Sequence, residues 1–287
     1  MAGQQTKKRI SFLGPEASFT HLAALKAFPD SEMIAYTTIP ECIEAVAENE
    51  VDYAVVPLEN ALEGSVPLTI DYLFHEVQLY VTAEVLSPIE QHLMVHPDNK
   101  DSESFEAIYS HPHALAQCHK FLYYTYKNTP LEQYSSTSAA AKMVSELPER
   151  NIAAIGNEFS AQKYGLRIVH REIHDFHFNH TRFFVLSKSN HQLENPAHNE
   201  VVKTTLMISP PEDDRSGVLH QVLSVFAWRQ LNLSKIESRP LKTGLGNYFF
   251  IADVLDDENS PMMQGAFQEL AALGCTVKTL GSYYTYK

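Results

Sequence analysis

Residues 53–66 read Tyr-Ala-Val-Val-Pro-Leu-Glu-Asn-Ala-Leu-Glu-Gly-Ser-Val, a short apolar run followed by a polar segment. The run at 53–56 has the residue types of a strand, and the stretch at 66–74 has the pattern of a helix. A polar segment between two such elements is held rigidly while its side chains point into a cleft. This stretch therefore predicts an α/β fold with a ligand site at the carboxyl end of a strand.

The same alternation continues on both sides of this stretch. Further strands are predicted at 8–13, 79–86 and 152–155, and further helices at 19–28, 39–48, 114–124 and 138–146. Strands that alternate with helices of this length favour α/β architecture with largely parallel sheets. The loops at 14–15, 57–64 and 110–112 would then lie where ligands bind in such folds.

The C-terminal residues follow a different order. Strands are predicted at 203–209, 234–241, 247–254 and 275–280, and helices at 217–230 and 263–273. The resulting order is β-α-β-β-α-β, the ferredoxin-like unit. Between the two regions, Ser189–Glu200 is polar, contains a proline and has no apolar periodicity, which is typical of a linker. We expect one domain at 7–188 and another at 201–287.

Composition excludes several classes of protein. The 287 residues include 35 acidic and 22 basic side chains, and the formal charge of −13 offers no electrostatic footprint for nucleic acid. No apolar run approaches the ~20 residues of a membrane span, and the apolar patch at 10–13 is too short for a signal peptide. Cys42, Cys118 and Cys275 lie far apart, which predicts free thiols in a cytoplasmic protein without a membrane partner.

Two polar segments are candidates for chemistry, although each also has a purely structural interpretation. Gly64-Ser65 could open a helix whose free N–H groups bind a carboxylate, but the pattern alone favours a turn with an N-cap serine. Thr181 and Arg182 stand at the entry of a strand predicted at 183–186. A hydroxyl beside a cation could bind an anion and pass a proton, whereas strand propensity explains the threonine equally well.

Histidines gather late in the first region, at positions 170, 174, 177 and 180, with His191 nearby in the linker. Their spacing suggests a metal site, but Phe176 and Phe178 alternate as in a strand, and few other ligands stand nearby. We therefore expect no functional metal. The turn at 14–19, with Ser18 as a possible N-cap, lacks the second glycine, lysine and Ser/Thr of a phosphate loop, so nucleotide binding is not supported.

Taken together, the motifs resemble the prephenate dehydratase family from Arg9 to about Leu280. The matching segments are Gly14–Thr20 (GPEASFT), Pro57–Gly64 (PLENALEG), Ser110-His111-Pro112 with Gln117-Cys118, Ser136–Ala141 (STSAAA) and Thr181-Arg182-Phe183. The C-terminal region resembles an ACT domain through Gly217-Val218-Leu219 and Ile236–Pro240 (IESRP). Ala61 replaces a serine of the family pattern, Ser18 and Thr20 exchange hydroxyl types with it, and His113 stands where glutamine is common.

The resemblance implies a bilobal, periplasmic-binding-protein-like catalytic domain without metal or organic cofactor, followed by an ACT regulatory domain. The chain would cross between the lobes near Thr82–Leu86 and again near Val169–Ile173. The implied reaction converts prephenate to phenylpyruvate with loss of CO₂ and water. The implied catalytic residues are Thr181, Asn60 and Gln117. The substrate-binding residues would be Glu59, Gly64, Ser65, Ser110, His111, Ser138, Ala139, Arg182 and Phe183.

Regulation and assembly follow from the same resemblance. L-Phenylalanine would bind between the ACT domains of paired subunits in a homo-oligomer, a dimer or tetramer that is held together through the ACT and catalytic domains. The matching effector residues are Gly217, Val218, Leu219, Asn232, Leu233, Ser234 and Glu237. Without the resemblance, ordinary core packing would explain Leu219 and Leu233.

Hydroxide is a poor leaving group, so the reaction needs a proton donor at the ring hydroxyl. The resemblance assigns this role to Thr181, and we expect Asn60 and Gln117 to orient it.

Three alternative functions stay open. The first is an arogenate dehydratase, which no sequence feature separates from a prephenate dehydratase. The second is a non-catalytic amino-acid sensor or solute-binding protein. The third is a metal-dependent enzyme that uses the histidines.

Overall fold

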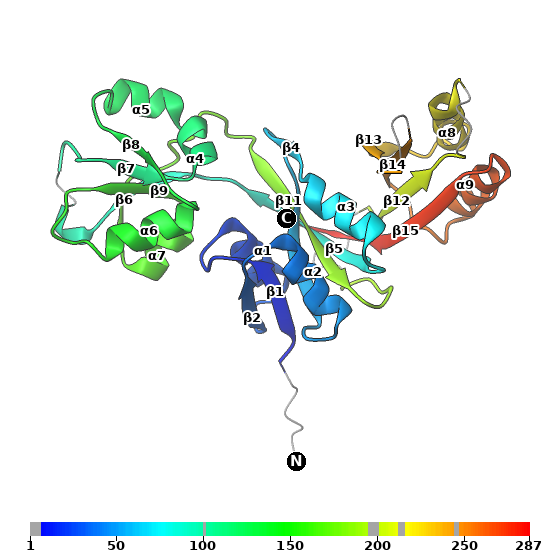
Figure 1. Cartoon of the computed structure of the whole chain (residues 1–287), viewed down its shortest axis with the longest axis horizontal. Helices are drawn as coiled ribbons and strands as arrows, with labels where there is room; N and C mark the ends of the chain where they lie inside the picture. Colours follow the sequence, from blue (N-terminus) through cyan, green and yellow to red (C-terminus); the bar gives the residue numbers. More distant parts are fainter. Residues whose placement is uncertain (1–6, 100–101, 195–200, 212–215, 244–246) are drawn as a thin grey trace, which may run out of the picture. The chain divides into compact units, whose positions relative to one another are not determined.

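The structure, a computed structural model, describes residues 7–99, 102–194, 201–211, 216–243 and 247–287 (Figure 1). The chain forms two compact units. The first contains the residues up to Ile70 and Leu86–Phe183, and the second contains Asp71–Val85 and Phe184–Lys287. The domain boundaries that the sequence predicts stay predictions, and residues 195–200 of the expected linker lie outside the described residues.

The first lobe of the first unit is built on a sheet in which β1 (Arg9–Leu13) lies between the edge strand β2 (Glu32–Tyr36) and β3 (Tyr53–Asn60). Strand β1 pairs in parallel with both neighbours. Helices α1 (Phe19–Ala27) and α2 (Ile39–Ala47) connect these strands. Thr38 and Glu41 form a capping box at the start of α2. Strand β11 (His180–Ser187) lies beside β3, and the short β4 (Gly64–Ser65) folds back antiparallel on β3.

The second lobe of the same unit contains a five-stranded sheet between two layers of helices (Figure 1). Its strands, in spatial order, are β10 (Arg167–His170), β6 (His92–Val95), β9 (Ala153–Gly156), β7 (Ile108–Ser110) and β8 (Leu131–Gln133). Helices α4 (Pro112–Gln117) and α5 (His119–Thr125) cover one core, and α6 (Thr137–Ser145) and α7 (Glu158–Tyr164) cover the other. A 3₁₀ turn follows β6 at Pro97–Asn99.

Several local expectations are wrong for identifiable reasons. The helix expected at 114–124 is two helices, because Cys118 takes a non-helical φ of −108° and ψ of 16°. The five-stranded sheet is mixed, not largely parallel, since β6 is antiparallel to both neighbours. Phe176 and Phe178 lie in an irregular, turn-containing loop with exposed rings and not in a strand. Gly64-Ser65, expected as a helix start or a turn with an N-cap serine, forms the short strand β4, because it pairs with β3. The sequence also does not predict strands β2, β6, β7, β8 and β10.

The two crossings between the lobes lie slightly later in the chain than expected. Strand β5 (Tyr80–Pro88) continues beyond 82–86, and the second lobe begins at His92, so the first crossing segment is 89–91. The second crossing segment is 171–179, between β10 and β11. The two segments are joined by hydrogen bonds, including one of 2.9 Å from the backbone N of Ile89 to the backbone O of Asn179.

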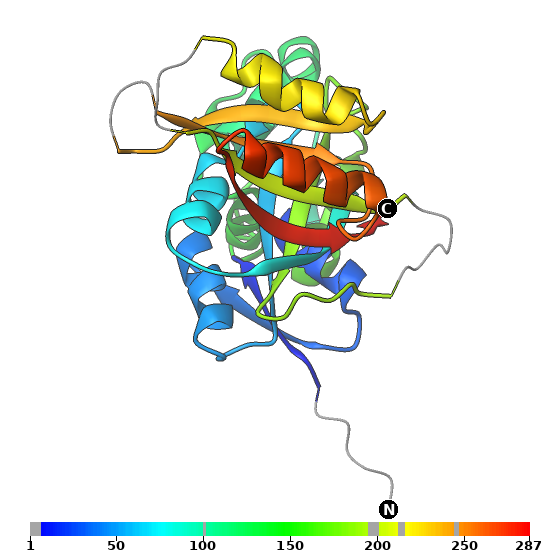
Figure 2. The same cartoon turned by 90° about the vertical axis from the view of Figure 1, so that its right-hand side faces the viewer.

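The second unit contains the predicted β-α-β-β-α-β module. Strands β13 (Leu233–Pro240), β14 (Tyr248–Val254), β12 (Lys203–Ser209) and β15 (Thr276–Tyr283) form an antiparallel sheet in that spatial order. Helices α8 (Val218–Ala227) and α9 (Pro261–Ala272) cover one face of this sheet (Figure 2). Apolar side chains of both helices pack on β12 and β14, which explains the periodicity of 217–230.

The chain end completes the second unit. Strand β16 (Thr285–Tyr286) pairs in parallel with β5, and the Tyr283 ring is fully buried against Phe184. Lys203 and the 2% exposed Glu84 form an ion pair of 2.8 Å. No helix within the described ranges is long and apolar enough to span a membrane.

Candidate active site

A pocket of about 550 Å³ lies in the first unit, between the ends of several strands and helices. Its walls come from both lobes and from both crossing segments or the strands that adjoin them. Its polar lining consists of Thr20, Asn60, Glu63, Ser65, Gln91, His111, His113, Gln117, Ser135, Ser136, Thr137 and Thr181. The predicted catalytic residues Asn60, Gln117 and Thr181 therefore line one cavity, as do the predicted binding residues Gly64, Ser65, His111 and Phe183.

The Asn60 amide is oriented by its own loop. Its Oδ1 accepts hydrogen bonds from the backbone N of Leu62 at 2.9 Å and of Glu63 at 3.1 Å. The other end of the amide, Nδ2, therefore donates to Thr181 Oγ1 at 2.9 Å and to Asn179 Oδ1 at 3.0 Å. Because Thr181 Oγ1 accepts from Asn60, the Thr181 hydroxyl proton is directed to another acceptor.

Gln117 ends helix α4 and reaches the same pocket. Its backbone O accepts a hydrogen bond of 2.7 Å from the backbone N of Asp175, which ties α4 to the second crossing segment. Its side-chain Oε1 is buried and has no hydrogen-bond partner among the described residues. Such an acceptor is suited to a donor that a ligand supplies.

Three nine-residue helices begin at the wall of the pocket. Phe19 and Thr20 of α1, Pro67 of α3 (Pro67–His75) and Thr137 of α6 line the cavity with their first turns. Helix N-termini carry partial positive charge and free N–H groups, and they bind anions. No lysine or arginine occurs among the described residues that line this pocket, so the helix ends are its main source of positive potential.

Arg182 and Glu59 face away from this cavity. Arg182 Nη1 lies 2.7 Å from Glu59 Oε2, and neither side chain belongs to the lining. Successive residues of a strand point to opposite faces, so Thr181 and Asn60 can face the pocket only if Arg182 and Glu59 do not. A direct contact of Arg182 or Glu59 with substrate stays a prediction without support from this geometry.

Three other predicted binding residues position the lining. Ser110 Oγ donates to the backbone O of Ile155 at 2.7 Å, just before His111. Ser138 Oγ donates to the backbone O of Glu16, which joins α6 to the turn before α1. The backbone N of Ala139 donates to the N-cap Ser136 Oγ at 3.0 Å. Their roles as direct ligands stay predictions.

Two histidines, His111 and His113, lie at the N-terminus of α4. Burial lowers the pKa of His111, with a smaller contribution in the same direction from His113, while Glu63 opposes both. His113 Nδ1 lies 2.9 Å from Glu63 Oε2. His111 Nδ1 accepts from the backbone N of His113 at 3.3 Å, so it also caps the helix. His111 is therefore neutral near pH 7 and presents no full charge to the pocket.

Comparisons with known proteins decide the family. A family model described as prephenate dehydratase matches residues 10–191, and an ACT domain model matches residues 213–272. The chain is 54% identical over 283 residues to a prephenate dehydratase of Bacillus subtilis, covering 97% of this chain and 99% of that protein. The chain belongs to the prephenate dehydratase family.

Solved structures agree with this family assignment. A prephenate dehydratase from Arthrobacter aurescens in complex with L-Phe is 31% identical, with a TM-score of 0.84 over 96% of this chain and 90% of that one. A structure named GqqA and described as a quorum quenching acylase is 26% identical, with a TM-score of 0.82 over 96% of this chain and 97% of that one. The same fold therefore occurs in a protein described with another activity, so the fold alone does not determine the reaction.

The predicted effector residues of this prephenate dehydratase family member lie on α8 and β13 or immediately before them. Gly217 precedes α8 with a φ of 88°, which favours glycine, and the Leu219 side chain is 44% exposed. Asn232 lies just before the edge strand β13, and Leu233 and Ser234 begin it. Glu237, also on β13, lies 3.2 Å from Lys235 and 3.7 Å from Arg239.

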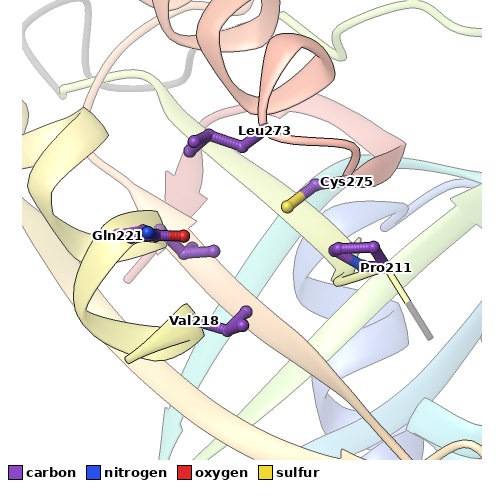
Figure 3. A pocket seen from close by; sticks show the side chains of 6 residues that line it. Pro211, Val218, Gln221, Leu273 and Cys275 are labelled. Carbon is purple, nitrogen blue, oxygen red and sulfur yellow. The ribbon is translucent and has the colours of Figure 1, made fainter. Parts of the chain in front are cut away.

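A small cavity adjoins the start of α8 (Figure 3). Its side chains come from Pro211, Val218 and Gln221, and from Leu273 and Cys275 after α9. The space amounts to about 10 Å³, roughly the room that one water needs. A phenyl ring does not fit there, so this cavity is not itself the predicted effector site.

The late histidines make ordinary contacts. His170 Nε2 lies 3.0 Å from the Tyr126 hydroxyl, and His174 Nδ1 accepts from the backbone N of Gln91 at 3.3 Å. Within the described ranges, no group of three or more His, Cys, Asp or Glu side chains could hold a metal ion.

Sequence reasoning missed Gln91, His113 and Asn179 as residues of the site. Gln91 and Asn179 come from the two crossing segments, where no periodicity marks the chain. His113 could have been found, because it follows the Ser-His-Pro segment in the first turn of α4.

Proposed function

We propose that this protein converts prephenate to phenylpyruvate in the pocket of its first unit, with Thr181 as the proton donor. The hydrogen bond of 2.9 Å from Asn60 Nδ2 to Thr181 Oγ1 carries the assignment. This hydrogen bond occupies one lone pair of Thr181 Oγ1, so the hydroxyl proton of Thr181 is available to a different acceptor. In a prephenate complex, that proton would be directed to the oxygen of the ring hydroxyl.

For this reaction the protein has to position prephenate and to supply one proton to the leaving oxygen. The bond between the ring and its carboxylate breaks, CO₂ leaves, and the electron pair enters the ring. The bond to the ring hydroxyl breaks with its electron pair, and that oxygen takes the Thr181 proton and leaves as water. Solvent then restores the Thr181 proton. General acid catalysis of this kind contributes about 10²–10⁴-fold, and positioning supplies much of the remainder.

The charge of the substrate fits the pocket. Prephenate carries two carboxylates, while the chain has a formal charge of −13. The N-termini of α1, α3 and α6 line the cavity and provide local positive potential without a competing cation. Glu63, which also lines the pocket, has its Oε2 at 2.9 Å from His113 Nδ1.

We also propose L-phenylalanine as an effector that binds the ACT domain. The A. aurescens prephenate dehydratase structure is a complex with L-Phe, and residues 213–272 of this chain match the ACT model. Effector binding changes activity only if two states of the protein differ in affinity for the effector. Elements that belong to both units can transmit such a change, and helix α3 is one of them.

Helix α3 supports this coupling because the division between the units passes through it. Its first residue lines the pocket. In the second unit, Asp71 lies 3.0 Å from both Arg239 and Lys242. Lys278 Nζ donates to backbone O atoms that include Leu73 at 2.6 Å. The C-terminal half of α3 is thus bound by the strands of the ACT module.

Further expectations accompany this function. We propose a cytoplasmic homo-oligomer, a dimer or tetramer, with a catalytic domain at 7–188, a linker at 189–200 and an ACT domain at 201–287. The three cysteines are free and buried, and burial raises the pKa of Cys42 to about 12, which is compatible with a reducing compartment. Arogenate remains the alternative substrate.

The test is product formation by the full chain. We expect purified protein to form phenylpyruvate from prephenate faster than it converts arogenate, and L-phenylalanine to change the rate. Thr125→Val, an exposed threonine at the end of α5, is the control for substitutions at Thr181. Absence of turnover of both substrates by the folded protein would overturn the proposed function.

A further inference from the structure

Gln91 is an amide in the pocket to which no role has been assigned. It belongs to the first crossing segment, is only 2% exposed, and lines the cavity that contains Asn60 and Thr181. Its side-chain Oε1 is buried without a hydrogen-bond partner among the described residues. Burial of a carbonyl oxygen without a hydrogen-bond donor costs folding free energy. A donor that a bound ligand supplies would satisfy this oxygen.

The backbone of Gln91 is held from the opposite crossing segment. Its N donates to His174 Nδ1 at 3.3 Å, and its O accepts from the backbone N of Ile173 at 2.9 Å. Both partners are buried. The main chain at Gln91 is therefore fixed where the two crossing segments meet, and the side chain can only extend from that fixed point.

The hydrogen-bonding groups that line the pocket limit the kind of ligand group that Gln91 can bind. Gln117 Oε1 is a second buried acceptor without a partner among the described residues, so the pocket offers two carboxamide oxygens in need of donors. Prephenate, with both carboxylates ionised, has a single hydrogen-bond donor, its ring hydroxyl. That hydroxyl can donate its hydrogen to one amide oxygen while its oxygen accepts the proton of Thr181.

We propose that Gln91 is a substrate-positioning residue, whose carboxamide oxygen accepts the hydrogen of the substrate's ring hydroxyl. This inference rests on the proposed function. The hydrogen bond is complete when substrate binds, and its hydrogen departs with the oxygen as part of the product water. It thus stabilises bound substrate at least as much as the transition state, and its removal affects KM more than kcat.

The decisive variant is Gln91→Leu, which keeps most of the volume and removes the amide. We expect KM for prephenate to rise about tenfold, the effect of losing one net hydrogen bond, while kcat stays within about threefold. The thermal midpoint should not fall, because Oε1 has no partner to lose in the free protein. Gln162→Leu, at an exposed glutamine of α7 outside this pocket, should leave KM unchanged.

A second variant adds a readout that a structural role would not change. Gln91→Glu places a carboxylate beside a dianionic substrate, so kcat/KM should fall at pH 8. The protonated glutamic acid is neutral and keeps a carbonyl acceptor, so kcat/KM should recover relative to the unsubstituted protein as the pH decreases. The unsubstituted protein lacks this titrating group and serves as the reference.

The outcomes separate the two proposals. If the unsubstituted protein forms phenylpyruvate but Gln91→Leu keeps KM within about twofold, the role of Gln91 is overturned while the function stands. A lowered thermal midpoint together with a pH-independent defect in Gln91→Glu would make Gln91 a structural residue and also overturn its role. If the unsubstituted protein does not convert prephenate, the proposed function itself fails.

Discussion

Asn60 Nδ2 donates a hydrogen bond of 2.9 Å to Thr181 Oγ1, and these residues come from neighbouring strands β3 and β11. The backbone of the Asn60 loop determines which end of the amide faces the threonine. The contact therefore orients the hydroxyl before any ligand binds, which is the preorganisation that general acid catalysis needs.

Asn60→Asp should abolish this orientation while it changes few atoms. The carboxylate cannot donate to Thr181, and it adds negative charge to a site for a dianion. We expect kcat/KM for prephenate to fall about 100-fold or more, as for loss of a preorganised donor. Steady-state kinetics measures the effect, and Asn259→Asp, in a loop of the second unit, is the matched control. Retention of kcat/KM within about threefold would contradict the role of Asn60.

Asp71→Asn should weaken feedback without loss of basal activity. It removes the charge that pairs with Arg239 and Lys242 at the C-terminal half of α3. We expect the concentration of L-phenylalanine for half-maximal effect to rise about five-fold or more, within the range of allosteric coupling energies. Inhibition curves at fixed prephenate measure this change, and Asp30→Asn, at an exposed turn, is the control. An unchanged effector response would argue against coupling through α3.

Stability should fall on mild acidification because buried histidines are held neutral. Burial is the main cause that lowers the pKa of His92, whose Nδ1 accepts from the backbone N of Glu172 at 2.9 Å. Below the ordinary pKa of about 6.5, the unfolded chain binds more protons than the folded chain, so the free energy of unfolding decreases as the pH falls.

The contribution of His92 can be isolated by His92→Asn, which retains an acceptor and does not titrate. We expect the thermal midpoint of the unsubstituted protein to decrease from pH 7.5 to about pH 5.5, and that of His92→Asn to decrease less. Burial also lowers the pKa of His21 and His111, so part of the dependence should persist. Identical pH profiles for the two proteins would contradict this prediction.

Gly281→Ala should destabilise the second unit. Gly281 has a φ of 118°, and an added Cβ would lie 2.8 Å from the backbone O of Val81. We expect a loss of at least about 1–3 kcal/mol in the free energy of unfolding, from backbone strain and the close contact. Gly165→Ala, also at positive φ but with open space around the Cβ position, should cost less. Chemical denaturation of both variants measures the difference.

The fold was predictable wherever side-chain periodicity matched a single buried face. Helix α8 is an example, since Val222, Val225 and Phe226 pack in one core with strands of the sheet. Prediction failed where tertiary contacts override local pattern. Cys118 interrupts a continuous helical pattern, and β8 consists of three exposed residues that are strand only because β7 lies beside them.

The site could be predicted in part for a similar reason. Thr181 and Asn60 stand in motifs that mark them, and both line the pocket. The alternation of strand side chains already implied that Arg182 and Thr181 point to opposite faces. Gln91, in contrast, reaches the cavity because two distant crossing segments bond to each other, which no local pattern in the sequence reveals.

The role of Thr181 as proton donor can be tested by two substitutions at this position. Thr181→Val keeps the shape of the side chain and removes the proton, and Thr181→Ser keeps the hydroxyl. In kinetics with prephenate, on proteins whose circular dichroism matches the unsubstituted chain, we expect Thr181→Val to lose about 100-fold or more in kcat and Thr181→Ser to retain most of it. A loss of less than about tenfold in Thr181→Val would contradict the assignment of Thr181 as the acid.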